Sequence, residues 1–221
     1  GVQTCALPIF GGDGAADFLT DIVQREGIDS SCIAYVPGPS GTALIEVDAN
    51  GANRIVVIPG SNDAVSVDHV RESMSSIDDI AVVLTQGEVP LPAIEAAMQM
   101  GREAGAITVL NPAPVREYPA TILAHVDYVI PNEHEAALLT GVPTSTKDES
   151  IMAAQALVNR GARCAIVTRG GEGCVWATAD ASGERGAFSI TPVDTVAAGD
   201  AFCGGLVAAL AEGQQIEEAL A

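Results

Sequence analysis

The sequence is poor in basic residues and almost without lysine: Lys147 is the only one, and ten Lys and Arg residues stand against 29 Asp and Glu. The formal net charge at pH 7 is -19. Such a surface repels nucleic-acid backbones and anionic lipid headgroups, so we expect neither as a partner. An anionic substrate would need local help from backbone dipoles and a divalent cation.

Long apolar runs and close cysteine pairs are also missing. No run approaches the roughly 18 residues of a spanning helix, so no membrane crossing is expected. The cysteines Cys5, Cys32, Cys164, Cys174 and Cys203 are odd in number and scattered, which argues against a zinc site and favours a reduced cytoplasm. Cys164 and Cys174 either face each other across a hairpin or, as we favour, are buried free thiols.

The two ends of the chain do not look like natural termini. Residues 1–9, GVQTCALPI, lack the basic start and apolar core of a signal peptide, and their back-translation resembles a common sequencing adapter. We expect them to be an artefact. At the other end, Ile216, Ala219 and Leu220 keep helical spacing without a Gly or Pro stop, so we expect an internal fragment of a longer protein.

From residue 80 onward, short runs rich in Val and Ile alternate with amphipathic, helix-like stretches. This alternation predicts an α/β fold: a doubly wound, mostly parallel sheet with helices on both faces, over residues 10–31 and 62–221. The predicted strands are AVVLTQG (81–87), AITVLNP (106–112), DYVIPN (127–132) and CAIVTRG (164–170), and the helices 93–103, 133–140 and 151–160.

Each predicted strand runs into a polar or glycine-bearing loop, namely residues 86–88, 111–114, 132–135 and 168–173. In open α/β sheets, ligands bind outside the carboxyl ends of the strands. We therefore expect these four loops to converge on one crevice.

Residues 32–61 have a different pattern. CIAYV, GTALIEVD and NRIVVIPG read as strands joined by turns too short for crossover helices, which predicts a small antiparallel flap. Ala43, Ile45 and Val47 alternate onto one face. The flap is either a plain extension of the sheet or a lid that excludes water from the crevice, and periodicity does not decide between them.

Residues 194–205, DTVAAGDAFCGG, carry the strongest functional pattern. Ala197, Ala198 and Gly199 are small enough for backbone to approach a ligand, and a helix beginning here would point its positive end at an anion. Asp200 would be repelled by that anion unless it takes a proton from a hydroxyl attacking from the far side. The alternatives are that Asp200 only stabilises the helix start and that the small residues only allow close packing.

This stretch closely resembles the C-terminal signature of the PfkB family of carbohydrate kinases, usually D-T-x-G/A-A-G-D-x-F. The resemblance implies that Asp200 is the catalytic base. It also implies that the N–H groups of Ala198, Gly199 and Asp200, in the turn that Ala197 opens, receive the γ-phosphoryl group of ATP. The departures are small: Ala197 stands where many members have glycine, and Cys203 where asparagine is common.

Two further stretches resemble nucleotide-site motifs of the family. In PNEHEAALLTG, Asn132 and Glu135 match the N-x-x-E motif that organises Mg²⁺ and its waters around ATP; the same spacing is also that of a helix capping box. In VTRGGEGCVW, the residues Thr168, Gly170 and Gly173 match the family's T-x-G-x-x-G turn near the nucleotide.

LNPAPVREYP, QGEVPL and the flap resemble the ribose-phosphorylating members in particular. On that resemblance Glu88 contacts the sugar, Asn111 lines the crevice beside it, and Ala43 and Ile58 belong to the lid face. The alternative is that both residues have structural roles alone: Glu88 as a charged residue at the start of a helix and Ile58 as a residue of the hydrophobic core. Asp194 and the carbonyl of Val196 resemble the loop that binds a monovalent cation in this family; Asp194 is otherwise a turn opener.

The resemblance therefore implies an ATP-dependent kinase that phosphorylates the 5-hydroxyl of D-ribose. It also implies that the enzyme requires Mg²⁺, is activated by K⁺ and forms a homodimer through the lid. The alternatives are a family member acting on deoxyribose, fructose or a nucleoside, and a non-catalytic sugar- or nucleotide-binding protein. We expect the 221-residue chain to be inactive by itself, because segments that hold the sugar and the adenine in the family are not in it.

Overall fold

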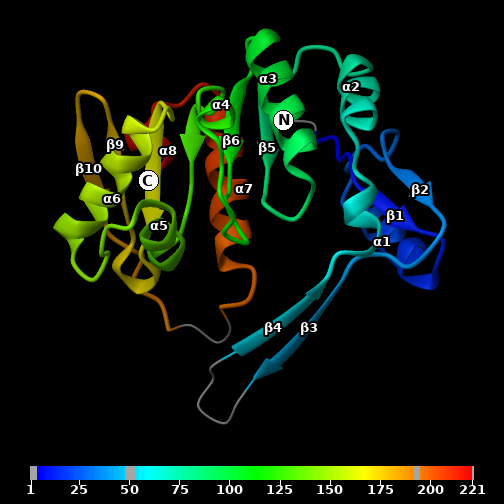
Figure 1. The fold of residues 1–221 in the computed structure, drawn as a ribbon, viewed down its shortest axis with the longest axis horizontal. Coiled ribbons are helices and arrows are strands. Elements are labelled where there is room, and N and C mark those ends of the chain that lie inside the picture. The colour runs from blue at the N-terminus through cyan, green and yellow to red at the C-terminus, as the bar shows by residue number, and fades with distance from the viewer. Residues whose placement is uncertain (1–3, 48–52, 192–194, 221) are drawn as a thin grey trace. The chain divides into compact units, whose positions relative to one another are not determined.

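The computed structural model describes residues 4–47, 53–191 and 195–220 of the chain (Figure 1). The chain divides into two compact units. Unit 1 comprises Gly1–Ser76 and Glu88–Ala93, and unit 2 comprises Ile77–Gly87 and Ile94–Ala221.

Unit 1 begins with a parallel strand pair connected by a helix. Strand β1 (Ile9–Gly11) pairs in parallel with β2 (Ala34–Val36), and α1 (Gly14–Arg25) forms the crossover. Asp13 caps α1 by accepting from the Ala16 N–H at 3.1 Å. The expectation that CIAYV belongs to the antiparallel flap is therefore wrong for residues 34–36: the residues before them form a crossover helix, so the strand joins β1.

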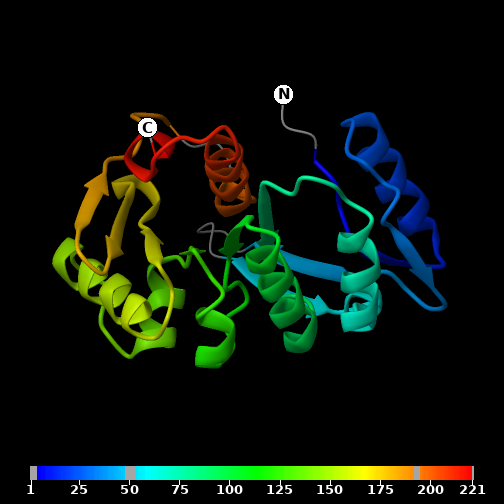
Figure 2. The same cartoon turned by 90° about the horizontal axis from the view of Figure 1, so that it is seen from above.

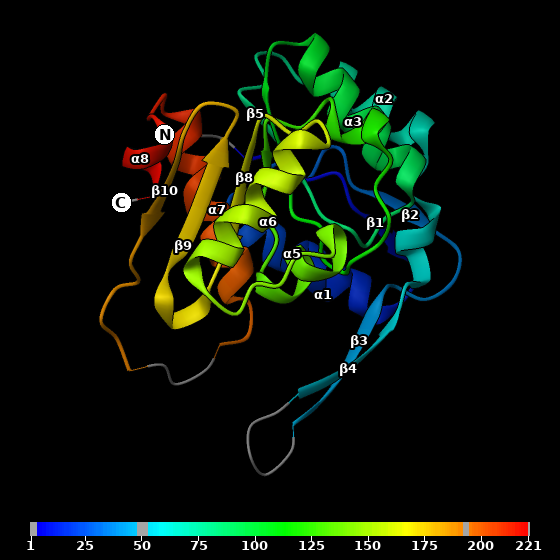
Figure 3. The ribbon, with the colours of Figure 1, turned by 60° about the vertical axis from the view of Figure 1, so that its left-hand side comes forward.

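The flap itself is a two-stranded antiparallel hairpin. Strand β3 (Thr42–Val47) pairs with β4 (Asn53–Ile58), with Thr42 opposite Ile58 and Leu44 opposite Val56. The predicted small antiparallel sheet is thus confirmed (Figure 3). The hairpin leads into a 3₁₀ turn, η1 (Gly60–Ala64), and then into α2 (Val67–Ser75), whose N-cap is Ser66.

Unit 2 contains a six-stranded sheet in the order β10-β9-β8-β7-β6-β5. The first four strands along the chain are parallel, and the last two are antiparallel. The predicted mostly parallel sheet is confirmed, and each predicted strand contains an observed one. The strands are β5 (Val82–Thr85), β6 (Ile107–Leu110), β7 (Tyr128–Val129), β8 (Cys164–Thr168), β9 (Cys174–Thr178) and β10 (Ser182–Arg185).

Helices cover both faces of this sheet (Figure 2). Helix α6 packs on β8 and β9 from one face, and α7 packs on β5 and β6 from the other. Buried side chains of α7, among them Leu206 and Leu210, share a core cluster with Ile166 and Trp176. The helices are α3 (Leu91–Glu103), α4 (Ala120–Leu123), α5 (Glu133–Thr140), α6 (Lys147–Asn159), α7 (Ala198–Ala211) and α8 (Ile216–Ala219), with a 3₁₀ turn η2 (Gly170–Glu172).

The cysteines are free thiols, and all but Cys5 are buried. The β8–β9 register places Cys174 opposite Thr168 and Cys164 opposite Thr178, so Cys164 and Cys174 do not face each other across the hairpin. The favoured interpretation, buried free thiols, is confirmed. Burial raises the pKa of Cys164 to about 12, which keeps this thiol protonated near neutral pH.

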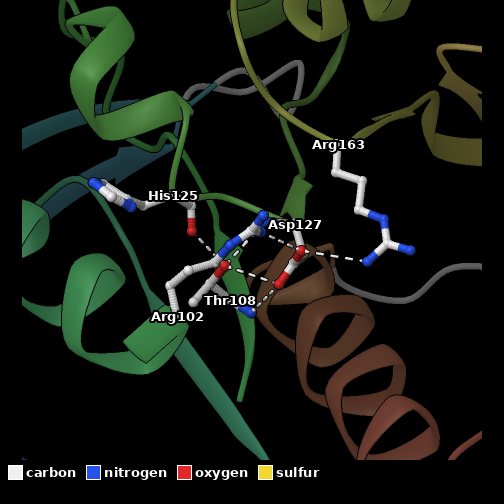
Figure 4. A network of polar contacts seen from close by, with 5 residues as sticks. All are labelled: Arg102, Thr108, His125, Asp127 and Arg163. Carbon is white, nitrogen blue, oxygen red and sulfur yellow. Dashed lines mark hydrogen bonds and ion pairs between the residues drawn. The ribbon is translucent and has the colours of Figure 1, made fainter. Parts of the chain in front are cut away.

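A buried carboxylate ties the amino ends of β6 and β7 together (Figure 4). Asp127 accepts from the Thr108 N–H at 3.0 Å and from Arg102 at 2.7 Å, and Arg163 lies 3.8 Å away. Thr108 Oγ1 in turn donates to His125 O at 2.6 Å. Because a buried charge is tolerated only when paired, this network stabilises the sheet edge opposite to the carboxyl ends.

Among the residues that the structure describes, no helix is long and apolar enough to cross a membrane.

Candidate active site

Three polar residues meet at the carboxyl edge of the parallel strands in unit 2. Asn111 follows β6, Asn132 follows β7, and Thr168 ends β8. Thr168 and Asn132 form an isolated parallel β-bridge, in which the backbone N–H of Thr168 donates to Pro131 O at 3.0 Å. Asn111 Nδ2 donates to Ile130 O at 2.8 Å. The convergence that we expected from the strand ends is therefore present for these residues.

Asn132 and Glu135 form a complete capping box at the start of α5. Asn132 Oδ1 accepts from the Glu135 N–H at 2.9 Å, and Glu135 Oε2 accepts from the Asn132 N–H at 2.8 Å. The capping interpretation of this motif is thus confirmed, and it leaves the second carboxylate oxygen outside the box. Desolvation raises the pKa of Glu135 above its usual range.

The TRGGEG turn between β8 and β9 requires glycine at two positions. Gly170 has φ +50° and Gly173 φ +91°, and a Cβ on Gly173 would collide with the backbone of Arg185 and Ala187. Sequence reasoning treated Arg169, in the same turn, as part of a glycine-rich loop; the structure buries it, with 8% of its surface exposed. Arg169 directly follows the last residue of β8 and is itself followed by two glycines and a glutamate, so no apolar pattern extended to it and indicated burial.

Helix α7 begins where the sequence predicted, with Asp200 exposed in its first turn. Its N-cap is Ala197, with φ +58° in the left-handed region. The Ala198 N–H donates to Thr195 O at 3.2 Å and is therefore engaged. Gly199 and Asp200 lie in the first turn, where an α-helix supplies no acceptor for an N–H.

The start of α7 lies at the same end of unit 2 as the β8–β9 turn (Figure 1). Burial raises the pKa of the Cys203 thiol, one turn into the helix, to about 11, and the carboxylates of Asp200 and Glu135 both add to this shift. Both carboxylates are thus close enough to act on the same buried sulfur. Unit 2 therefore brings the two acidic candidates to one region.

In unit 1, the residues expected at the sugar lie around one pocket of about 210 Å³. Ala43 and Ile58 come from the hairpin, and Glu88 from the segment after β5. Asn62 was not singled out from the sequence; a Cβ on Gly41 would meet its side chain at 3.2 Å, so the two pack together. The pocket is lined by Phe10, Leu19, Ser40, Gly41, Thr42, Ala43, Val57, Ile58, Ser61, Asn62 and Glu88.

The cation candidates are only partly described. Asp194 lies outside the described residues, and Val196 is 59% exposed. Within residues 4–47, 53–191 and 195–220, no group of three His, Cys, Asp or Glu side chains is arranged to hold a metal ion. The hard oxygen donors of Asn132 and Glu135 fit a Mg²⁺ that contacts the protein mainly through water.

A protein-family model described as "pfkB family carbohydrate kinase" matches residues 1–221. The ribokinase of Staphylococcus aureus (strain COL) is 35% identical over 213 residues, covering 96% of this chain and 70% of that protein. The deoxyribokinase of Salmonella typhi is 36% identical over 196 residues, covering 88% and 64%. Among solved structures, a ribokinase from Cryptococcus neoformans var. grubii serotype A in complex with ADP has a TM-score of 0.81 at 26% identity, covering 100% and 74%.

Proposed function

This chain belongs to the pfkB family of carbohydrate kinases, and from that membership we propose that it transfers the γ-phosphoryl group of ATP to the 5-hydroxyl of D-ribose. The products are ribose 5-phosphate and ADP. Similarity to ribokinases over nearly the whole chain supports ribose as the acceptor. The observation that carries the reaction type is Asp200 in the first turn of α7, at the end of unit 2 where Asn132 and Thr168 meet.

In the proposed reaction, Asp200 accepts the proton of the attacking hydroxyl as the new O–P bond forms. Its carboxylate lies in the first turn of α7, at the positive end of the helix dipole. The Gly199 and Asp200 N–H groups then stabilise the charge of the transferring phosphoryl group. Ala198 contributes to this anion site only if its N–H leaves Thr195 O, and Ala197 shapes the turn.

We assign the nucleotide side to unit 2. Thr168, Gly170 and Gly173 form the turn beside the nucleotide, and Asn132 and Glu135 hold the waters around Mg²⁺. When bound, Mg²⁺ supplies positive charge to the phosphate oxygens. K⁺ near Asp194 and the Val196 carbonyl is proposed from the family resemblance; a requirement for K⁺, measured against Na⁺ and Cs⁺, tests it.

On the sugar side, we propose that Glu88 accepts hydrogen bonds from sugar hydroxyls and that Ala43 and Ile58 cover an apolar edge of the sugar. The unit 1 pocket brings these three residues together, which supports the assignment. Asn111 is proposed to line the acceptor crevice. Ile58 is 47% exposed and is therefore not a core residue. It pairs with Thr42, whereas Ala43 pairs with Val57, so Ala43 and Ile58 belong to opposite faces of the hairpin and not to one lid face as expected.

A deoxyribokinase relative of similar identity, 36% against 35% for the ribokinase of Staphylococcus aureus, makes 2-deoxyribose the second candidate acceptor. The test is a panel of ribose, 2-deoxyribose, fructose and nucleosides, with ADP release measured on the gene product that carries these 221 residues. We expect ribose to give the highest kcat/KM and ³¹P NMR to place the phosphate on the 5-oxygen. A higher kcat/KM for another sugar would keep the kinase activity but change the proposed substrate. If no acceptor in the panel is phosphorylated, a non-catalytic binding protein is favoured.

We further propose that the protein forms a homodimer through the hairpin and works in a reducing compartment such as the cytoplasm. Leu44 and Val56 share one face of β3 and β4 and are 55% and 49% exposed, which supports an apolar contact with a second copy. The free thiols support the compartment. Leu44→Asp should produce monomers in analytical ultracentrifugation; an unchanged sedimentation coefficient would argue against this interface.

A further inference from the structure

Arg169 is a buried arginine in the glycine-rich turn that follows β8. Only 8% of its surface is exposed. Burial of a guanidinium is costly unless its charge is compensated. The contacts that compensate it therefore indicate what the residue does.

Two carboxylates from different elements approach the guanidinium. The Nη2 atom lies 2.6 Å from Glu172 Oε2, within the same turn, and Nε lies 3.4 Å from Glu133 Oε1 on α5. The second contact is an ion pair without hydrogen-bond geometry. The backbone N–H of Arg169 donates to Gly173 O at 2.7 Å, and this hydrogen bond closes the turn. Arg169 thus connects the β8–β9 turn to the first turn of α5, two elements that adjoin in Figure 3.

Both connected elements belong to the proposed nucleotide site. Glu133 directly follows Asn132 and begins the helix whose capping box contains Glu135. Arg169 directly follows Thr168, which bridges to Asn132, and precedes Gly170. If the contacts of the Arg169 side chain were lost, the capping box of α5 and the β8–β9 turn could shift relative to each other.

We infer that Arg169 is a positioning residue for the nucleotide phosphates, holding the Asn132–Glu135 box in register with the Thr168–Gly173 turn and neutralising Glu133 and Glu172 beside them. The inference rests on the proposed function of this edge as the ATP site. Arginine suits the role because its planar guanidinium reaches two carboxylates at once, which an ammonium group does less well. In a chain of net charge -19, removing it would leave two carboxylates uncompensated near the phosphates.

The test is the affinity for Mg²⁺ and a non-hydrolysable ATP analogue, measured by calorimetry on the gene product that carries these residues, with Arg169→Met, Arg169→Lys and wild type. We expect Arg169→Met to weaken binding by about tenfold and Arg169→Lys by a smaller factor. Arg163→Met serves as control, because Arg163 is an exposed arginine at the opposite sheet edge. It should bind the analogue as wild type does.

Steady-state kinetics separates positioning from loss of fold. Arg169→Met should raise the KM for Mg·ATP with little change in the KM for ribose, whereas partial unfolding would lower kcat at unchanged KM. Equal analogue affinity in wild type and Arg169→Met overturns the inference. If Arg169→Met does not fold, wild-type affinity in Arg169→Lys overturns it instead.

The two proposals fail in different ways. If the wild-type protein binds the analogue but phosphorylates no sugar, the proposed function as a sugar kinase is rejected. A loss of affinity in Arg169→Met would then still support the inference about Arg169. A wild-type protein that binds no nucleotide removes both.

Discussion

Ala197 shows how one residue type can conflict with the backbone that it occupies. The motif places alanine at the N-cap of α7, and the structure gives it φ +58°. An L-residue with a side chain pays about 1–2 kcal/mol for the left-handed region, whereas glycine adopts it freely. The departure from glycine, a small one in the sequence, therefore has a structural cost at the start of α7.

Ala197→Gly should stabilise the protein. The relief of backbone strain exceeds the extra chain entropy of glycine by about 0.5–1 kcal/mol, or roughly 2 °C in Tm for a chain of this size. Differential scanning calorimetry measures the shift. Ala208→Gly, an exposed position inside the same helix, is the matched control and should lower Tm. A lower Tm in both variants would mean that position 197 is not strained.

At the scale of elements, α5 carries two roles on the same residues. Asn132 caps the helix, and the proposed function also assigns it to the waters around Mg²⁺. Capping and ligand binding are separable, because aspartate caps a helix about as well as asparagine but brings a negative charge toward the phosphates.

Asn132→Asp should therefore keep the Tm within about 1 °C of wild type, since the cap is retained, and should raise the KM for Mg·ATP about tenfold or more through charge repulsion. Thr146→Asp likewise places an aspartate at a helix N-cap, in the capping box of α6, and is the control for an added charge. Unchanged KM for Mg·ATP in Asn132→Asp would leave Asn132 with the capping role alone.

The elements that the sequence predicted well are those whose local pattern matches their burial. Strands β6 and β8 are buried on both faces and are mostly apolar in sequence, and α5 spans the predicted residues 133–140. Strand β2 has three residues and no alternation, so its parallel partner β1 could not be read locally. Asp127 and Arg169 were missed because Asp127 pairs with Arg102 and Arg169 pairs with Glu133, in each case on another element far away in the sequence.

For the whole molecule, buried thiols predict a loss of stability at alkaline pH. Burial raises the pKa of Cys203 to about 11 and that of Cys164 to about 12, from 9.0. Above pH 9 the unfolded chain releases these protons and the folded chain keeps them, so the free energy of unfolding falls as pH rises. For Cys203 alone, the loss between pH 9 and 11 is about 2 kcal/mol.

Urea unfolding at pH 8, 9 and 10 measures this slope. Cys203→Ala should flatten the decline, whatever its effect on baseline stability. Val207→Ala, which shortens a neighbouring side chain of the same core without removing a titratable group, should keep the wild-type slope. Identical slopes in all three proteins would show that Cys203 ionises as readily folded as unfolded.

The central claim is that Asp200 is the base of a ribose kinase. The most direct measurement is ATP-dependent ribose phosphorylation by the gene product that carries these residues and by its Asp200→Asn variant, with Mg²⁺. The account predicts activity in the wild type and a fall in kcat of about a hundredfold or more in the variant, with nucleotide affinity retained. Ribose phosphorylation by Asp200→Asn within about threefold of wild type would contradict the assignment of the base.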